Sequence, residues 1–145
     1  MLIILEGLDK CGKSTFAQNF ALCGAIVKHS TKEDDALSVL KNAAIMSGTQ
    51  TVILDRSFLS EMCYGPVYRG EMRITPERFN IIKEILHETP HILLYFSRPE
   101  NEIRNFDKND EFESDIEKLR LVEKRYKMYI AEFKRYFNIY EIQYK

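Results

Sequence analysis

Short apolar runs alternate along the chain with longer segments whose apolar residues recur every three or four positions. The runs cover residues 2–5, 25–27, 51–54 and 92–96, and each is too short to be a helix. Uninterrupted runs of this length are typical of strands that are buried on both faces of a parallel sheet. Residues 138–144 instead alternate apolar and polar positions, which predicts a fifth strand.

The segments between these runs have helical spacing. Three shorter helices are predicted over residues 13–22, 34–46 and 57–64. A further helix is predicted to begin at Thr75-Pro76-Glu77, which supplies a hydroxyl cap, a proline at the first helical position and an acid in the first turn. Apolar residues from Ile116 to Phe137 mark a long last helix. The alternation of strands and helices predicts an α/β domain with a mainly parallel, five-stranded sheet.

Composition and charge narrow the choice of partners. The 145 residues suit one domain, and the 21 basic and 22 acidic side chains leave a formal charge of -1. A protein that binds nucleic acid mainly by neutralising phosphates is expected to be more basic, so nucleic acid stays an open but unfavoured partner. The 3 cysteines form no C-x-x-C pair, and no apolar stretch is long enough to span a membrane. We therefore expect a cytoplasmic protein without a membrane partner.

One motif carries specific chemistry. Residues 7–14 read Gly-Leu-Asp-Lys-Cys-Gly-Lys-Ser and match the phosphate-binding pattern G-x-x-x-x-G-K-[ST] at each fixed position, between a predicted strand and a predicted helix. The glycines let backbone N–H groups turn inward around phosphate oxygens, and the helix presents its positive end to the same anion. Lys13 can reach the β- and γ-phosphates, and the Ser14 hydroxyl can ligate Mg²⁺.

Asp55 is the predicted partner of this loop. It ends the apolar run 51–54, and so it lies at the carboxyl edge of the predicted sheet, where ligands of open α/β sheets bind. Its carboxylate can hold Mg²⁺ or accept a proton from the attacking group. A second interpretation is that Asp55 caps the helix that follows Ser57, and the two roles are compatible.

The loop motif alone is shared by ATPases, GTPases and kinases. The N-K-x-D motif with which GTPases read their base does not occur, and residues 105–108 read Asn-Phe-Asp-Lys instead. Motor and helicase ATPases usually need a longer chain than this. A small kinase is therefore the simplest interpretation.

Three segments resemble thymidylate kinases in the order in which that family has them. Residues 5–15 resemble its E-G-x-D-[RKG]-x-G-K-[ST]-[ST] loop, and Asp55-Arg56-Ser57 with Ser60 and Tyr64-Gly65 is similar to D-R-x-x-x-S-x-x-[AV]-Y. Pro99-Glu100, residues 110–113 and Arg125-Tyr126 look like the P-E, D-R-F-E and R-Y pieces around the lid of that family. Deoxynucleoside kinases share the general plan but are expected to have E-R-S at residues 55–57.

This resemblance implies a fold and a cofactor. The fold is a P-loop kinase-type three-layer sandwich around a central, mainly parallel five-stranded sheet. Residues 1–145 are expected to form a single domain, with an acceptor-binding region at about residues 56–75 and a short lid at about residues 99–114. ATP and Mg²⁺ are the implied cofactors, and a nucleotide is the implied substrate.

The resemblance also implies roles for individual residues. Lys13, Lys10, Asp55 and Arg56 are the implied catalytic residues, and Ser14 and Asp55 are the implied metal ligands. The implied ATP-binding residues are Gly7, Asp9, Lys10, Cys11, Gly12, Lys13, Ser14, Thr15, Arg104 and Lys108. The implied acceptor-binding residues are Asp9, Arg56, Glu61, Tyr64, Arg69 and Arg73.

Three functions remain open at this stage. The first is a nucleoside monophosphate kinase most like thymidylate kinase, and a homodimer is one open state of assembly. The second is a kinase that phosphorylates a modified nucleoside or a hydroxyl carried by nucleic acid, because residues 60–70 are richer in functional side chains than the family pattern needs. The third is a non-catalytic, ATP-binding regulatory protein, because the closing helix that the family usually adds has no counterpart after residues 138–144.

Overall fold

A parallel sheet of five strands forms the centre of the molecule. The computed structural model describes residues 1–8, 12–31, 33–97 and 116–143. The strands lie in the order β2-β3-β1-β4-β5, and each neighbouring pair is parallel. Their bounds are β1 (Leu2–Gly7), β2 (Ile26–His29), β3 (Val52–Asp55), β4 (His91–Ser97) and β5 (Ile139–Gln143).

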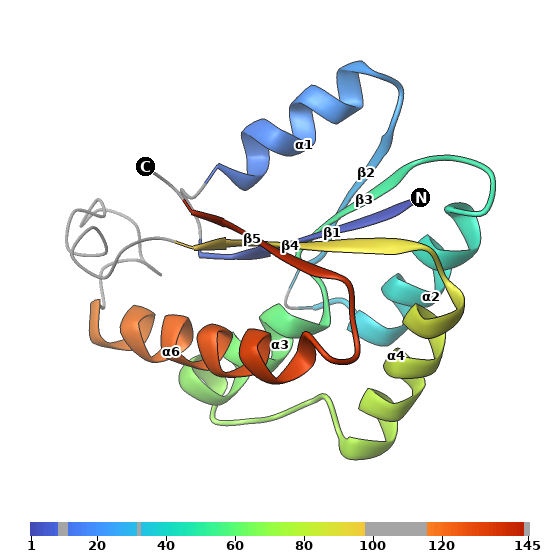
Figure 1. The fold of residues 1–145 in the computed structure, drawn as a ribbon. Coiled ribbons are helices and arrows are strands. Elements are labelled where there is room, and N and C mark those ends of the chain that lie inside the picture. Colours follow the sequence, from blue (N-terminus) through green and yellow to red (C-terminus); the bar gives the residue numbers. More distant parts are fainter. Residues whose placement is uncertain (9–11, 32, 98–115, 144–145) are drawn as a thin grey trace.

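Helices cover both faces of this sheet (Figure 1). The helix α1 (Lys13–Leu22) lies on one face and packs against β1, β2 and β3. The other face carries α2 (Ala36–Met46), α3 (Phe58–Tyr64), α4 (Pro76–Glu88) and α6 (Ile116–Phe133). The predicted three-layer α/β architecture is therefore confirmed. Within the described ranges, no helix combines the length and the apolar character that crossing a membrane requires.

Strand register decides which side chains face which helical layer. The Phe96 ring contacts Phe16 of α1 with 5.8 Å between centroids, whereas the Tyr95 ring stacks on Tyr126 of α6 at 5.5 Å. Glu6 is in register with Tyr95 and so faces α6. Asp55 is in register with Leu5, two residues before Gly7, and so lies on the α1 face.

The last helix is shorter than its apolar periodicity predicts. We expected it to extend to Phe137, but α6 ends at Phe133 and a turn follows. Phe137 is nevertheless buried, and its ring packs edge-on against Phe58 at 5.5 Å and Phe133 at 5.8 Å. Apolar periodicity indicates which residues are buried, and it does not show where a helix ends. Phe137 lies after the end of α6 but is buried in the same core as the apolar face of that helix.

A π-helix, η1 (Gly65–Arg69), continues α3 and was not predicted. The N–H groups of Gly70 and Glu71 both bond to the Gly65 carbonyl, which closes this wider turn. A side chain at Gly65 does not fit, because its Cβ would lie 2.7 Å from the carbonyl oxygen of Glu71. Single π-turns of this kind often occur at functional sites.

Gly7 is the position where the fold tolerates a side chain least. Its φ is +132°, and an added Cβ would lie 2.3 Å from the backbone oxygen of Phe96 in β4. We expect Gly7→Ala to lower the unfolding free energy by about 3 kcal/mol or more, since it adds a backbone clash to an unfavourable φ. Urea unfolding checks this value.

Gly24→Ala is the matched control for this substitution. Gly24 has a φ of +92°, but nothing lies within 4 Å of an added Cβ. The control should cost only about 1 kcal/mol, from the positive φ alone. Equal losses for the two variants would show that the close approach of Gly7 to β4 is not the constraint.

Candidate active site

The phosphate-loop motif joins β1 to α1 at the carboxyl edge of the sheet. Gly12 caps α1 with a φ of +93°, and its carbonyl accepts the N–H of Phe16 at 3.1 Å. The Lys13 side chain is only 4% exposed, and its ammonium donates to the carbonyl of Leu8 inside the loop. Ser14 and Thr15 are exposed in the first turn of α1, at the positive end of the helix dipole.

Some of the sequence-predicted site residues cannot be placed. Asp9, Lys10 and Cys11 of the loop, and Arg104 and Lys108 of the predicted lid, lie outside the described residues, as does the lid at about residues 99–114. Their roles remain predictions that rest on the resemblance.

Asp55 lies at the end of β3 and pairs with His29 at the end of β2. The Asp55 carboxylate is 2.9 Å from the Nδ1 atom of His29, and the two side chains are 11% and 66% exposed, respectively. The alternative role of Asp55 as the cap of α3 does not match the hydrogen bonds, since the N–H groups of Ser57, which precedes α3, and of Ser60 in its first turn both bond to the Glu6 carboxylate. Asp55 therefore remains available to the α1 side of the sheet.

Ser14 and Asp55 fit the chemistry of a magnesium site. Both offer hard oxygen atoms, and α1, which carries Ser14, packs on β3, which ends in Asp55. In the part of the chain that the structure describes, no group of three or more His, Cys, Asp or Glu side chains could hold a metal ion. Mg²⁺ does not require such a group, because it is commonly held by one or two protein oxygens together with substrate phosphates and water.

Arg56 has a strained backbone next to Asp55. Its φ is +75°, which is unfavourable for a residue with a side chain, and its N–H bonds to the Leu5 carbonyl at 2.9 Å. Its guanidinium lies 5.0 Å from the centre of the Tyr64 ring and 3.4 Å from the Ser60 hydroxyl. The strained turn thus directs the arginine toward α3 at the carboxyl edge of the sheet.

A buried carboxylate, Glu6, organises this corner and was not among the predicted site residues. It is 0% exposed, and one oxygen, Oε1, accepts the N–H groups of Ser57 at 2.7 Å and Ser60 at 3.2 Å. The other oxygen, Oε2, accepts the hydroxyls of Ser60 at 2.5 Å and Tyr126 at 2.9 Å. Glu6 therefore ties the residue before the loop to the start of α3 and to α6.

The surroundings of Glu6 partly offset the cost of burying its charge, and the pKa of its carboxyl stays raised. Burial raises the pKa of this carboxyl, while the Ser60 hydrogen bond, the Arg56 charge, the Tyr126 hydrogen bond and the Ser57 backbone hydrogen bond act in the opposite direction. Burial also raises the pKa of Tyr126, so its hydroxyl stays protonated and donates. The E-G and R-Y segments contain this glutamate and this tyrosine, but no local pattern pairs two residues that are 120 positions apart.

The other acceptor-binding candidates form one cluster along α3 and η1. Arg69 donates to the Glu61 carboxylate, and the Nε atom of Arg73 is 3.8 Å from the same oxygen. The Tyr64 and Tyr68 rings stack at 5.8 Å. The structure thus brings together Arg56, Glu61, Tyr64, Arg69 and Arg73, all from the region that we predicted to bind the acceptor.

The order of the strands and the helical layers are similar to those of solved nucleotide and nucleoside kinases. The YorR protein of Bacillus subtilis, solved with phosphorylated GDP, matches 99% of this chain and 85% of its own, with a TM-score of 0.78 and 19% identity. Thymidylate kinase of Candida albicans matches 98% of this chain and 82% of its own, with a TM-score of 0.63 and 16% identity.

A third similar structure is a deoxynucleoside kinase. Deoxyadenosine kinase of M. mycoides, solved with dCTP, matches 99% of this chain and 90% of its own, with a TM-score of 0.60 and 14% identity. No protein-family model matches the sequence, and no curated protein matches it significantly. At these identities the likeness establishes the fold alone.

The Glu6 network predicts a large loss of stability on truncation. Glu6→Ala leaves the donors of Ser57, Ser60 and Tyr126 without their shared acceptor, and we expect a loss of about 3 kcal/mol or more in unfolding free energy. Glu88→Ala, on the exposed surface of α4, should change it by no more than about 0.5 kcal/mol. Thermal and urea unfolding measure both, and similar small losses would contradict a central role for Glu6.

Proposed function

We propose that this protein is an ATP-dependent kinase that phosphorylates a nucleoside monophosphate, and that its substrate preference is most like that of thymidylate kinases. One observation carries the proposal. Glu6, which directly precedes the phosphate loop, accepts a hydrogen bond from the N–H of Ser57 at the start of α3. The positive charge of Arg56 acts to lower the pKa of the Glu6 carboxyl. Glu6 would therefore link the proposed site of the phosphate donor to the arginine that would bind the acceptor phosphate.

The donor site would be formed by the loop, by α1 and by Lys13. Backbone N–H groups at the N-terminus of α1 would bind phosphate oxygens of ATP, and the helix dipole would favour their negative charge. The Lys13 ammonium would move from the Leu8 carbonyl to the phosphates, where it would offset the charge that develops during transfer.

Ser14 and Asp55 would hold Mg²⁺ with the phosphates of ATP. When bound, the ion would neutralise phosphate charge and orient the γ-phosphoryl group. The proposal for this ion rests on the oxygen donors of the two residues and on their common position on the α1 side of the sheet.

The acceptor site would be formed by the region at about residues 56–75. The Arg56 guanidinium suits a phosphate, because its planar N–H fork can bind two oxygens at once. The stacked Tyr64 and Tyr68 rings and the Glu61 carboxylate would contact the nucleoside. An oxygen of the acceptor phosphate would attack the γ-phosphorus, and the bond from that phosphorus to the β–γ bridging oxygen would break to release ADP.

The similar structures support this class of reaction. They are a thymidylate kinase, a deoxyadenosine kinase with bound dCTP and a YorR protein with bound phosphorylated GDP. Each of them acts on or binds a nucleotide or nucleoside. The Asp55-Arg56-Ser57 sequence favours a monophosphate acceptor over a nucleoside, because of its resemblance to the thymidylate-kinase pattern.

A panel of acceptors tests the proposal. We expect coupled ADP release with at least one nucleoside monophosphate, and Lys13→Ala should lower kcat/KM by about a hundredfold or more, since it removes a charge aimed at the transferring group. Circular dichroism should show that the variant keeps its fold. The panel covers deoxy- and ribonucleoside monophosphates, free nucleosides and DNA oligonucleotides.

The other outcomes separate the competing functions. Transfer of labelled γ-phosphate to an oligonucleotide or nucleoside, but to no monophosphate, would favour the kinase of hydroxyl groups. ATP binding without transfer to any acceptor would favour a regulatory protein. Either outcome would contradict the monophosphate kinase.

Arg56 should act on the acceptor rather than on ATP. We expect Arg56→Ala to raise the KM for the acceptor by roughly tenfold or more, because a charge-assisted hydrogen bond contributes about 1.5–3 kcal/mol. The KM for ATP should change little. Arg135→Ala, which removes an exposed arginine 3.7 Å from Glu132 near the end of the chain, is the control and should leave both values unchanged. An increase confined to the KM for ATP would argue that Arg56 belongs to the donor site.

A further inference from the structure

A second buried carboxylate, Glu123, lies in the α6 layer and has no part in the reaction described above. It is 3% exposed, and the buried hydroxyl of Tyr95 in β4 donates to its Oε1 atom. Its Oε2 atom is also buried, and it has no hydrogen-bond partner within the part of the chain that the structure describes. A buried carboxylate oxygen without a hydrogen-bond partner lowers the stability of the folded protein, so its presence calls for a functional explanation.

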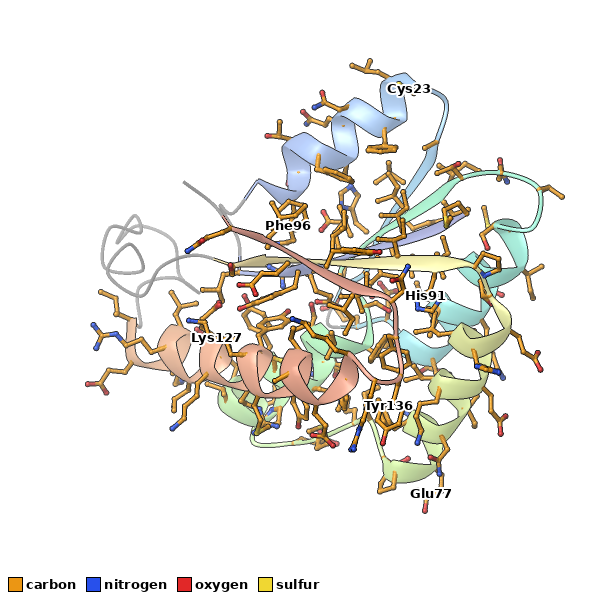
Figure 2. The ribbon with its side chains drawn as sticks, in the orientation of Figure 1. Cys23, Glu77, His91, Phe96, Lys127 and Tyr136 are labelled. Carbon is orange, nitrogen blue, oxygen red and sulfur yellow. The ribbon has the colours of Figure 1, made fainter. Side chains whose placement is uncertain are left out.

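The Glu123 and Glu6 carboxylates have similar partners. Glu6 is bonded to Tyr126 and Glu123 to Tyr95, and the two tyrosine rings stack at 5.5 Å. Glu123 and Lys127 are one turn apart on α6, whose place under the sheet is visible in Figure 2. Glu123 thus belongs to the same polar layer as the carboxylate that precedes the phosphate loop.

Charged and titratable groups face Glu123 from each element packed around it. They are Tyr95 of β4, Glu141 of β5, Cys63 of α3, Lys127 of α6 and Lys13 at the start of α1. Burial raises the pKa of the Glu123 carboxyl most strongly, and Glu141 raises it further. The Tyr95 hydrogen bond and the charges of Lys127 and Lys13 lower it, but they do not cancel the effect of burial.

The interaction with Lys13 connects Glu123 to ligand binding. The same ammonium is attracted by the Glu123 carboxylate and, under the proposed function, by the phosphates of ATP. A bound triphosphate would draw Lys13 toward itself and would add negative charge near Glu123. Both effects favour the neutral carboxylic acid over the carboxylate.

We propose that Glu123 is a positioning residue for the phosphate loop, which attracts the Lys13 ammonium as a carboxylate and shifts toward its protonated form, with uptake of protons from solvent, when a nucleoside triphosphate binds. The proposal rests on the proposed function only in that Lys13 contacts the phosphates. In the complex Glu123 loses its proton at a higher pH than in the free protein. Between these two pH values binding is coupled to proton uptake, so the affinity for ATP falls as pH rises through the window.

Calorimetry of ATP binding to the whole chain tests the proposal. Mg-ATP is titrated into wild type and Glu123→Gln at a series of pH values between 5 and 9, in pairs of buffers that differ in ionisation enthalpy, which gives the number of protons taken up. The glutamine keeps an oxygen for the Tyr95 hydroxyl but cannot ionise. Subtracting the variant from wild type removes the titration of ATP itself.

We expect wild type to take up more protons than Glu123→Gln within this window of pH. The two proteins should bind ATP equally at low pH, and the variant should bind roughly tenfold more tightly at high pH, which corresponds to about one unit of pKa change. Glu132→Gln makes the same charge change on the exposed face of α6 and should behave as wild type. Identical proton uptake in wild type and Glu123→Gln would overturn the proposal.

Tyr95→Phe gives a second test that does not require Glu123 to be replaced. Loss of the hydroxyl removes a hydrogen bond that stabilises the carboxylate, so the window of proton uptake should move to higher pH. A window that stays in place or moves to lower pH would contradict the inference. This readout separates a positioning role from a merely structural one, which would change stability without moving the window.

The stability of the free protein supplies a measurement without ATP. The pKa of Glu123 is raised in the folded state, so its stabilising contribution is complete at low pH and is lost as pH rises through the folded value. Glu123→Gln should therefore lose less unfolding free energy than wild type between low and high pH. Equal losses would overturn the claim that the pKa of Glu123 is raised in the folded protein.

The proposed function and this inference fail in different ways. ATP binding with the expected proton uptake, but without phosphoryl transfer, would support the inference and contradict the kinase. Transfer with unchanged proton uptake in Glu123→Gln would do the reverse. Failure of well-folded wild type to bind Mg-ATP would overturn both.

Discussion

The carboxylate of Glu6 is the interaction on which the arrangement of the site depends. It is the last side chain before the phosphate loop, and its two oxygens collect four donors from the start of α3 and from α6. A buried negative charge is tolerated only when such donors and a nearby cation compensate its loss of hydration. Arg56 supplies a positive charge that favours the ionised form of Glu6, although burial still raises the pKa of the carboxyl overall.

Local signals were sufficient to predict much of the fold. The helix Lys13–Leu22 and the cap of α4 at Thr75 follow from neighbouring residues, and the structure has both, with the Thr75 hydroxyl accepting the N–H of Arg78 at 3.2 Å. The end of α6 could not be predicted in this way, because Phe137 is buried by Phe58 and Phe133 rather than by helical periodicity. The π-helix at Gly65 depends on a contact with Glu71 that no local pattern reports.

The same distinction between local signals and long-range contacts applies to the candidate site. The loop motif was readable because its residues are contiguous and each has a fixed chemical task. The Glu6–Tyr126 and Glu123–Tyr95 pairs were not readable, since their members are 120 and 28 residues apart and meet only through the register of β1 and β4 beneath α6. Asp55 was predicted from the strand that it ends, whereas its contact with His29 follows from the pairing of β2 with β3.

The π-helix η1 is a position at which homologous chains could differ by one residue in length. A π-turn holds one residue more than the α-turn that would replace it, so a deletion there can be absorbed by ordinary helical hydrogen bonding. Each residue of an α-helix turns the chain by about 100°, so the same deletion would rotate Arg69 away from Glu61. Under the proposed function, in which this segment binds the acceptor, gain or loss of a single codon is a route by which evolution could alter ligand preference while the sheet and its core stay unchanged.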